Sequence, residues 1–342
     1  MANPRVLMIR LSSLGDVVLS TSAVEAFAST RPGERLDILT KPAFKEVFRG
    51  NPAVGEVLTW EADESPLAMA KKLRTRQYDY IIDLHDNLRT RALRFLVRGV
   101  KWSVYKKGSL RRRCAVALRA PGRLAETHVV ERYAAAFAPL GVPVGITLPR
   151  LYPSREDEEL ASTLLGGELN ELKTPVALAP GARWATKGWP KTKWVELIRT
   201  IAKEGRVLPV MVGGDSEREL CAELLERGGV PGINAAGKCT ILETAALLGR
   251  CEGLVTGDSA PLHIACAVGT PVLALFGPTV RGFGFYPLGE DDRVIELEIE
   301  CRPCSLHGGD HCPKGHFNCM EGIAPDRVQR ALLDIIDSGK AP

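Results

Sequence analysis

Residues 253–279 read GLVTGDSAPLHIACAVGTPVLALFGPT and combine the patterns of a strand, a helix and a second strand. Two apolar runs, at 253–256 and 271–276, flank a helical segment over 261–267 that begins with a proline. Short glycine-containing connections join the three pieces. Such a unit makes its two strands parallel and covers their sheet with a helix. The stretch therefore predicts an open, parallel α/β sheet.

The same alternation of strand and helix extends outward from this stretch in both directions. The expected strands are Arg5–Arg10, Leu36–Leu39, Glu56–Trp60, Tyr80–Leu84, Val176–Ala179, Val207–Val212, Gly253–Thr256 and Pro271–Phe276. The expected helices are Leu14–Thr30, one near Lys45, Leu67–Arg76, one from Leu88, Glu156–Leu165, Thr192–Glu204, Ser216–Arg227, Ile241–Leu248, Pro261–Ala267 and Asp326–Asp337. The pattern restarts at Pro175, so we expect two α/β units.

The length of the chain agrees with two domains. A single hydrophobic core rarely grows beyond about 250–300 residues, and this chain has 342. A proline-rich stretch, Pro149–Pro153, begins the expected linker, which we place near 150–172. We therefore expect one Rossmann-like domain over 1–160, a second over 172–322 and, over 323–342, a helix that could pack on either.

The composition excludes disordered and fibrous proteins. The chain is 45% hydrophobic and carries 45 Lys+Arg against 41 Asp+Glu, a net charge of +4 that is too small to indicate nucleic-acid binding. The N-terminus shows no signal-peptide pattern, and the longest uncharged run, 259–280, contains prolines and glycines unsuited to a membrane span. We expect a cytoplasmic protein whose nine cysteines stay reduced.

Ligands of open parallel sheets bind beyond the carboxyl ends of the strands, which directs attention to the loops there. The first loop, residues 11–16, places Asp16 at the start of a helix. Its carboxylate could simply complement the helix dipole or could act as a general base. The dinucleotide fingerprint G-x-G-x-x-G is absent from this loop.

Two loops of the second half have the composition of anion-binding sites. Residues 179–190 offer Arg183, Thr186 and Lys187 as donors for phosphate oxygens. The loop 256–263 opens a helix whose first backbone N–H groups, at Ser259 and Ala260, are free to hold an anion. Its carboxylate and imidazole, Asp258 and His263, have structural alternatives as a helix cap and a core histidine.

A strongly basic segment occupies residues 87–123, with twelve Lys/Arg and no carboxylate. This asymmetry favours an anionic partner, although a solvated face and RNA binding are alternatives. Its cations are Arg89, Arg91, Arg94, Arg98, Lys101, Lys106, Lys107, Arg111, Arg112, Arg113, Arg119 and Arg123.

Four cysteines gather near the C-terminus in the pattern C-x2-C-x7-C-x6-C. Four thiolates at short spacing could close a tetrahedral zinc site or hold an iron–sulfur cluster, but the longer spacings match no standard module and free thiols are an equal alternative. The candidate ligands of this structural zinc site are Cys301, Cys304, Cys312 and Cys319.

Several of these motifs together resemble glycosyltransferase family 9, the ADP-heptose:lipopolysaccharide heptosyltransferases, over about residues 5–330. The cysteine-rich tail resembles the heptosyltransferase II branch. The motifs are RLSSLGDVV at 10–18, PG at 180–181, KGWP at 187–190, VGG at 212–214, GDSAPLHIA at 257–265, GTP at 269–271 and LFGPT at 275–279.

The resemblance implies a GT-B architecture of two Rossmann-like α/β/α domains and an inverting transfer of heptose that needs no metal cofactor. It makes Asp16 the general base and Lys187 the cation that neutralises the departing diphosphate. The implied donor-binding residues are Thr186, Lys187, Gly213, Asp258, Ser259, Ala260, His263 and, as a nucleoside contact, Glu243. The implied acceptor-binding residues are Ser13, Arg89, Arg111, Arg112 and Arg113.

The implied partners are ADP-heptose, a lipid A–Kdo inner-core acceptor and the inner leaflet of the inner membrane, with no nucleic acid. Such an enzyme would be cytoplasmic and peripherally membrane-associated, because cations near an anionic leaflet each contribute about 1 kcal/mol. Two alternatives stay open: heptose transfer to protein Ser/Thr, and a non-catalytic metal- or redox-responsive binding protein that uses the cysteine tail.

Overall fold

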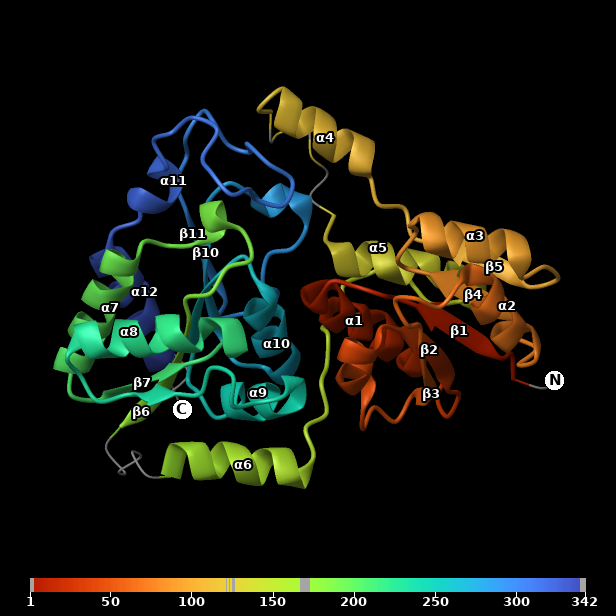
Figure 1. Ribbon diagram of the computed structural model, residues 1–342, viewed down its shortest axis with the longest axis horizontal. Helices are drawn as coiled ribbons and strands as arrows, with labels where there is room; N and C mark the ends of the chain where they lie inside the picture. The colour runs from red at the N-terminus through yellow and green to blue at the C-terminus, as the bar shows by residue number, and fades with distance from the viewer. Residues whose placement is uncertain (1–2, 121, 123, 125–126, 167–172, 339–342) are drawn as a thin grey trace. The chain divides into compact units, whose positions relative to one another are not determined.

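The computed structural model describes residues 3–120, 122, 124, 127–166 and 173–338. The chain divides into two compact units (Figure 1). The N-terminal unit comprises Met1–Lys107 and Thr127–Tyr152, and the C-terminal unit comprises Gly108–Glu126 and Pro153–Pro342. Arg123 of the basic segment and residues 167–172 of the expected linker lie outside the described residues.

The N-terminal unit contains a five-stranded, wholly parallel sheet with strand order β3-β2-β1-β4-β5. Its elements are β1 (Val6–Ile9), α1 (Leu14–Thr30), β2 (Leu36–Thr40), the 3-10 helix η1 (Pro42–Phe48), β3 (Val54–Thr59), α2 (Pro66–Arg74), β4 (Tyr80–Asp83), α3 (Leu88–Leu96), β5 (Lys101–Val104), α5 (Val129–Ala136) and the 3-10 helix η3 (Ala138–Leu140).

The C-terminal unit contains a six-stranded parallel sheet with strand order β11-β10-β9-β6-β7-β8. Its helices are α4 (Ser109–Ala117), α6 (Arg155–Gly166), α7 (Lys191–Lys203), α8 (Arg218–Gly228), α9 (Ile241–Leu248), α10 (Ala260–Val268), α11 (Asn318–Glu321) and α12 (Pro325–Ser338). Its strands are β6 (Thr174–Ala179), β7 (Val207–Met211), β8 (Ile233–Asn234), β9 (Leu254–Gly257), β10 (Val272–Phe276) and β11 (Arg293–Glu296), and its 3-10 helices are η4 (Ala185–Lys187), η5 (Asp215–Glu217) and η6 (Arg281–Phe283).

The central strands of both sheets are apolar, as expected for strands that are buried on both faces. The central strand β1, VLMI, is entirely buried, and β7 and β10 are buried along their whole length. In the N-terminal unit, α2 and α3 cover one sheet face through Met69, Leu73 and Leu93. In the C-terminal unit, α7, α8 and α12 share one continuous core with the strands. The sequence predicted two α/β units, each built on a parallel sheet, and that prediction is confirmed.

The elements differ from the sequence expectations at the sheet edges and at the domain boundary. The strands β5, β8 and β11 were not predicted; all three are short edge strands with partly exposed residues. The boundary expected at residue 160 falls inside α6, which packs on α9 of the C-terminal unit. The last helix, α12, packs on α7 of the same unit. Within the described chain, no helix is both long and apolar enough to cross a bilayer.

Candidate functional site

Three loops of the N-terminal unit meet at the carboxyl ends of neighbouring strands β1, β4 and β5. The first carries Asp16 in the opening turn of α1. One carboxylate oxygen of Asp16 accepts hydrogen bonds from the hydroxyl of Ser13 at 2.9 Å and from its backbone N–H at 3.3 Å. Asp16 therefore closes the capping box of α1, whose N-cap is Ser13, and its place in the first turn also lets it complement the helix dipole, one of its two alternative roles.

The other carboxylate oxygen of Asp16 faces the interior of the N-terminal unit. It lies 2.7 Å from the guanidinium of Arg10 and accepts a hydrogen bond from the Tyr133 hydroxyl at 3.3 Å. The side chain of Asp16 is still 23% exposed, whereas Arg10 and Tyr133 are buried. A capping residue needs no such buried partners. Both carboxylate oxygens therefore have fixed partners, and the side chain still reaches the surface, where a ligand can approach it.

Arg10 ties the first loop to the second. Its guanidinium pairs with Asp16, donates a hydrogen bond to the carbonyl of Leu84 and lies 5.5 Å over the Tyr133 ring. Burial alone would lower the pKa of Arg10, but the neighbouring Tyr133 and Asp16 outweigh it and the pKa lies above its ordinary value. The cation beside Asp16 is thus permanent.

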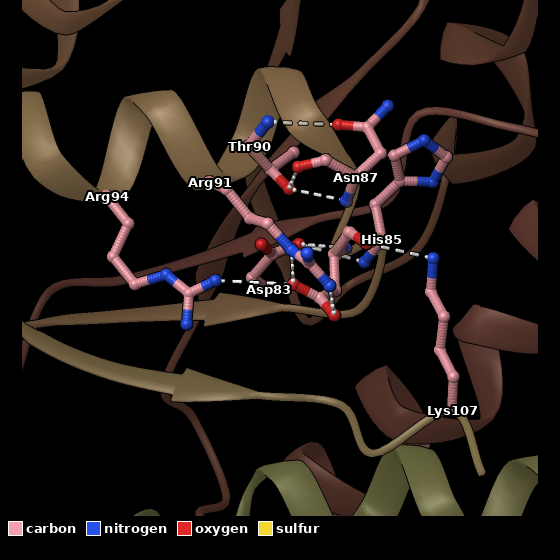
Figure 2. Close-up of polar contacts among 8 residues, drawn as sticks. Asp83, His85, Asn87, Thr90, Arg91, Arg94 and Lys107 are labelled. Carbon is pink, nitrogen blue, oxygen red and sulfur yellow. Dashed lines mark hydrogen bonds and ion pairs between the residues drawn. The ribbon is translucent and has the colours of Figure 1, made fainter. Parts of the chain in front are cut away.

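The second loop follows β4 and is drawn in Figure 2. The carboxylate of Asp83 is fully buried and accepts the backbone N–H groups of His85 and Asp86 at 2.9 and 2.8 Å. These bonds turn the chain so that Asp86 adopts a positive φ of 43°. Asn87 then caps α3 through the backbone N–H of Thr90.

Cations surround this second loop (Figure 2). Arg91 binds the Asp86 carboxylate through two nitrogens, each at 2.9 Å, and Arg94 approaches it at 3.2 Å. The hydrogen bonds from Arg91 hold the pKa of Asp86 below its usual range. Lys107, from the third loop, which follows β5, donates to the Asp86 carbonyl at 3.0 Å. The carboxyl edge of this sheet is therefore rich in fixed positive charge.

His85 stays neutral among these groups. Burial, followed by the charges of Arg10 and Lys107, lowers the pKa of His85 to about 3. Its Nδ1 is buried and has no hydrogen-bond partner among the described residues. A neutral imidazole beside a carboxylate can orient a hydroxyl but does not compete for its proton.

In the C-terminal unit, the loops after β6, β9 and β10 bring Lys187, Asp258 and Thr279 together. The Lys187 ammonium lies 2.6 Å from the Asp258 carboxylate and 3.2 Å from its carbonyl oxygen. Thr279 donates its hydroxyl to the same carboxylate oxygen at 2.8 Å. A Cβ on Gly257 would lie 3.1 Å from the Lys187 carbonyl, so a larger residue there would have to displace the Lys187 backbone by a few tenths of an ångström. Lys187 and Asp258, predicted separately, form one ion pair.

Residues 301–309 of the cysteine-rich segment, which we call the strap, bond to the loops that carry Thr186 and Thr279. The hydroxyl of Thr186 accepts the Gly309 N–H at 2.8 Å and lies 3.0 Å from the Gly309 carbonyl. The buried guanidinium of Arg302 donates to the carbonyls of Gly277 and Thr279. Thr186, predicted to bind the donor phosphates, is thus buried and engaged in holding the strap.

The other predicted donor residues take mixed positions. Ser259 is the N-cap of α10, Ala260 is its first residue, and His263 is buried in the same helix. Glu243 accepts the backbone N–H of Thr240 at 2.7 Å and so closes the capping box of α9. Its capping role explains Glu243 without a ligand. Gly213 lies directly after β7, where its carbonyl accepts the Gly237 N–H at 3.0 Å.

The predicted acceptor residues are divided between the two units. Arg89 stacks on the Trp60 ring at 4.3 Å and donates to backbone carbonyls at 61 and 64. Arg111 and Arg113 are exposed on α4, and Arg112 lies over the Phe285 ring at 6.0 Å. Because α4 belongs to the C-terminal unit, these three arginines and Arg89 belong to different compact units, although the sequence analysis treated them as one segment.

Three of the four tail cysteines, Cys301, Cys304 and Cys312, lie between β11 and α11, and Cys319 lies in α11. Cys301, Cys304 and Cys312 are partly exposed and Cys319 is buried. Burial raises the pKa of Cys319 to about 11. Among the described residues no three His, Cys, Asp or Glu side chains are placed to hold one ion. The zinc site stays a prediction that this geometry does not support.

Sequence reasoning missed several residues of both sites. Arg10 ends the first predicted strand and could have been noticed as a lone cation in a buried run. Tyr133 gives no signal, because it lies more than a hundred residues from Asp16 within an ordinary helix pattern. Thr279 and Arg302 act through contacts that only the folded chain reveals.

Comparison with known proteins agrees with this geometry. The family model "Glycosyltransferase family 9 (heptosyltransferase)" matches residues 67–310. The chain is 24% identical to lipopolysaccharide heptosyltransferase 2 of Escherichia coli K12, covering 96% of this chain and 97% of that one. It is 28% identical to lipopolysaccharide heptosyltransferase 1 of Pseudomonas aeruginosa, covering 88% and 86%.

A solved structure described as E. coli ADP-heptose lps heptosyltransferase II superposes with a TM-score of 0.75 at 22% identity, covering 98% of this chain and all of that one. The two Rossmann-like units are those of the GT-B architecture, which confirms the predicted fold. On the extent of the family match, with the fold and both loop motifs in agreement, the chain belongs to glycosyltransferase family 9.

Proposed function

We propose that this glycosyltransferase moves L-glycero-D-manno-heptose from ADP-heptose to the inner core of lipopolysaccharide, with inversion at the anomeric carbon. The observation that carries the proposal is the Asp16 carboxylate, which Arg10, Tyr133 and Ser13 hold in place and whose side chain is still 23% exposed. The names of the similar proteins, which are lipopolysaccharide heptosyltransferases, support the same donor and acceptor class.

In the proposed reaction the acceptor hydroxyl oxygen attacks the anomeric carbon, and the bond from that carbon to the diphosphate oxygen breaks. Asp16 takes the hydroxyl proton as general base, a role that typically accelerates reactions by about 10²–10⁴-fold. Because Arg10 favours the charged carboxylate, Asp16 is a weak base, and proton transfer comes late, as attack acidifies the hydroxyl. His85, which stays neutral, leaves that proton to Asp16.

ADP leaves with its diphosphate charge neutralised by Lys187, helped by the backbone N–H groups at the start of α10. Electrostatic stabilisation of a leaving group can contribute a few kcal/mol for each donor. Asp258 holds Lys187 in place, and we propose that it also accepts hydrogen bonds from sugar hydroxyls. Since a cation and helix N–H groups provide this stabilisation, we propose that catalysis needs no metal ion.

The decisive experiment incubates the protein with ADP-heptose and lipid A that carries Kdo sugars and either no heptose or one heptose, and weighs the products. A gain of one heptose mass on either acceptor supports the proposal, and no gain on both refutes it. Asp16→Asn should abolish the gain while ADP binding, measured by calorimetry, is retained. Prior dialysis against EDTA should leave the rate unchanged.

A lipid-linked acceptor places the reaction at a membrane. We propose that the protein works in the cytoplasm, at the inner face of the inner membrane, as a peripheral enzyme. The excess of cations in residues 87–123 supports an anionic surface as partner. Fractionation of cells with high-salt washing would test it: release of the protein from membranes by salt is the expected result.

A further inference from the structure

The N-terminal unit exposes large apolar side chains on two neighbouring helices. Leu88 and Phe95 of α3 are 84% and 77% exposed, and Leu67 of α2 is 51% exposed. Leu88 and Phe95 stand seven residues apart, two helical turns, and therefore lie on one stripe of α3. The opposite face of the same helix is buried through Leu93, so α3 is in place with this stripe outward.

The two helices run side by side in the same direction. At one end, Arg89 of α3 stacks on Trp60 and bonds to carbonyls just before α2. At the other end, Arg74 of α2 donates to the carbonyl of Leu96, the last residue of α3. Figure 1 shows the pair lying together over β4 and β5. Their exposed residues thus form one surface, which we call the α2–α3 surface.

Cations are interleaved with these apolar side chains. Residues 66–74 and 88–98 contain seven Lys/Arg and no carboxylate: Lys71, Lys72, Arg74, Arg89, Arg91, Arg94 and Arg98. Three of these cations are paired, Lys72 with Glu64 at 2.7 Å and Arg91 and Arg94 with Asp86. Two exposed carboxylates, Glu61 and Asp63, precede α2. Lys71 and Arg98 are exposed, and the Arg98 guanidinium lies beside Phe95, bonded to its carbonyl at 3.4 Å.

We infer that the α2–α3 surface docks on an anionic lipid bilayer, with Leu88 and Phe95 entering the headgroup region. Apolar side chains among Lys/Arg on one helical surface are the combination that binds bilayer interfaces, because burial and charge attraction add. A protein partner would instead need carboxylates matched to fixed positions, whereas a lipid surface accepts any pattern of cations. The inference rests on the proposed function in one respect, that the acceptor is lipid-linked.

The test is sedimentation with phosphatidylcholine vesicles, with and without phosphatidylglycerol. The wild-type protein should bind only the phosphatidylglycerol vesicles, and high salt should release it. Leu88→Ser/Phe95→Ser should bind at least tenfold more weakly. Lys71→Gln/Arg98→Gln should bind about thirtyfold more weakly, since each cation near an anionic leaflet contributes about fivefold.

A matched control is Val144→Ser/Ile146→Ser, which removes two exposed apolar side chains from the coil before Arg150. This variant should bind vesicles like the wild type. The inference is overturned if the wild-type protein ignores anionic vesicles, or if both α2–α3 variants bind them normally. Circular dichroism confirms folding, and the charge variant provides a second test should the apolar one unfold.

Failure of this inference can be told apart from failure of the proposed function. With a deacylated, water-soluble inner-core acceptor, Leu88→Ser/Phe95→Ser should retain the wild-type kcat/KM, and with the acceptor in anionic vesicles it should lose activity in parallel with binding. If no acceptor is heptosylated by the wild-type protein, the proposed function fails, while vesicle binding still decides the role of the α2–α3 surface.

Discussion

The ion pair between Arg10 and Asp16 predicts a strong energetic coupling. Arg10 is buried and Asp16 is 23% exposed, with 2.7 Å between their charged atoms. Breaking a buried pair by removing one partner costs about 3–5 kcal/mol, and the exposure of Asp16 places this pair at or below the low end. We expect Arg10→Met and Asp16→Asn each to destabilise the protein by about 2–3 kcal/mol.

The double variant separates this coupling from ordinary loss of contacts. With both charges removed, no ion is left buried without a partner. The double variant should therefore lose about 1–2 kcal/mol less unfolding free energy than the two single variants lose in sum. Urea unfolding of all four proteins, followed by circular dichroism, measures the difference. Additive effects would refute the reasoning that the pair acts as a unit.

The same variants have a kinetic signature. Arg10→Met removes the cation that favours the charged carboxylate, so the acidic limb of the pH–rate profile should move to higher pH. Arg10→Lys keeps the charge and should move the limb less, although one ammonium cannot bond both Asp16 and the Leu84 carbonyl as the guanidinium does. A wild-type profile in Arg10→Met would show that Arg10 is structural only.

Three further predictions follow from the two sites. Lys187→Met should lower kcat/KM for ADP-heptose at least a hundredfold, measured by ADP release, and should lower Tm because Asp258 loses its partner. Thr186→Val leaves the Gly309 N–H without its acceptor and should cost about 1–3 kcal/mol in urea unfolding, whereas Thr186→Ser should restore stability. Burial and then nearby cations lower the pKa of His85 to about 3. Between pH 6.5 and 3 the unfolded chain therefore binds a proton at His85 that the folded chain does not bind. The free energy of unfolding should fall as the pH drops from about 6.5 toward 3. His85→Gln should flatten that fall, and an NMR titration showing a protonated His85 at pH 5 would contradict the cause.

The central strands and amphipathic helices were predictable because their burial pattern is local. The predicted helices at 14–30 and 241–248 coincide with α1 and α9. The edge strand β5 escaped prediction because its sequence, KWSV, has an exposed first residue and no long apolar run. The excursion of residues 108–126 into the C-terminal unit was equally unpredictable, since membership of a unit depends on long-range contacts.

The residues of the candidate sites likewise divide into those that a local sequence pattern indicates and those that depend on long-range contacts. The sequence singled out Asp16, Lys187 and Asp258 as candidates, because each follows a predicted strand beside small residues. Glu243 was placed near the nucleoside on position alone, and the structure shows its carboxylate engaged in capping α9. Tyr133, which bonds to Asp16, comes from a distant segment that no local pattern indicates, and the bond between Thr279 and Asp258 joins the loops after two different strands.

The packing of α12 sets an order for folding during synthesis. The core of the C-terminal unit includes Val328, Leu332 and Ile335 of this helix, whereas the N-terminal unit is complete at Tyr152. Domains fold as they leave the ribosome, N-terminal first. The N-terminal unit can therefore fold while translation continues, but the unit that carries Lys187 must wait for α12. A chain that ends before residue 325 would hold a folded N-terminal unit attached to an unfinished C-terminal unit.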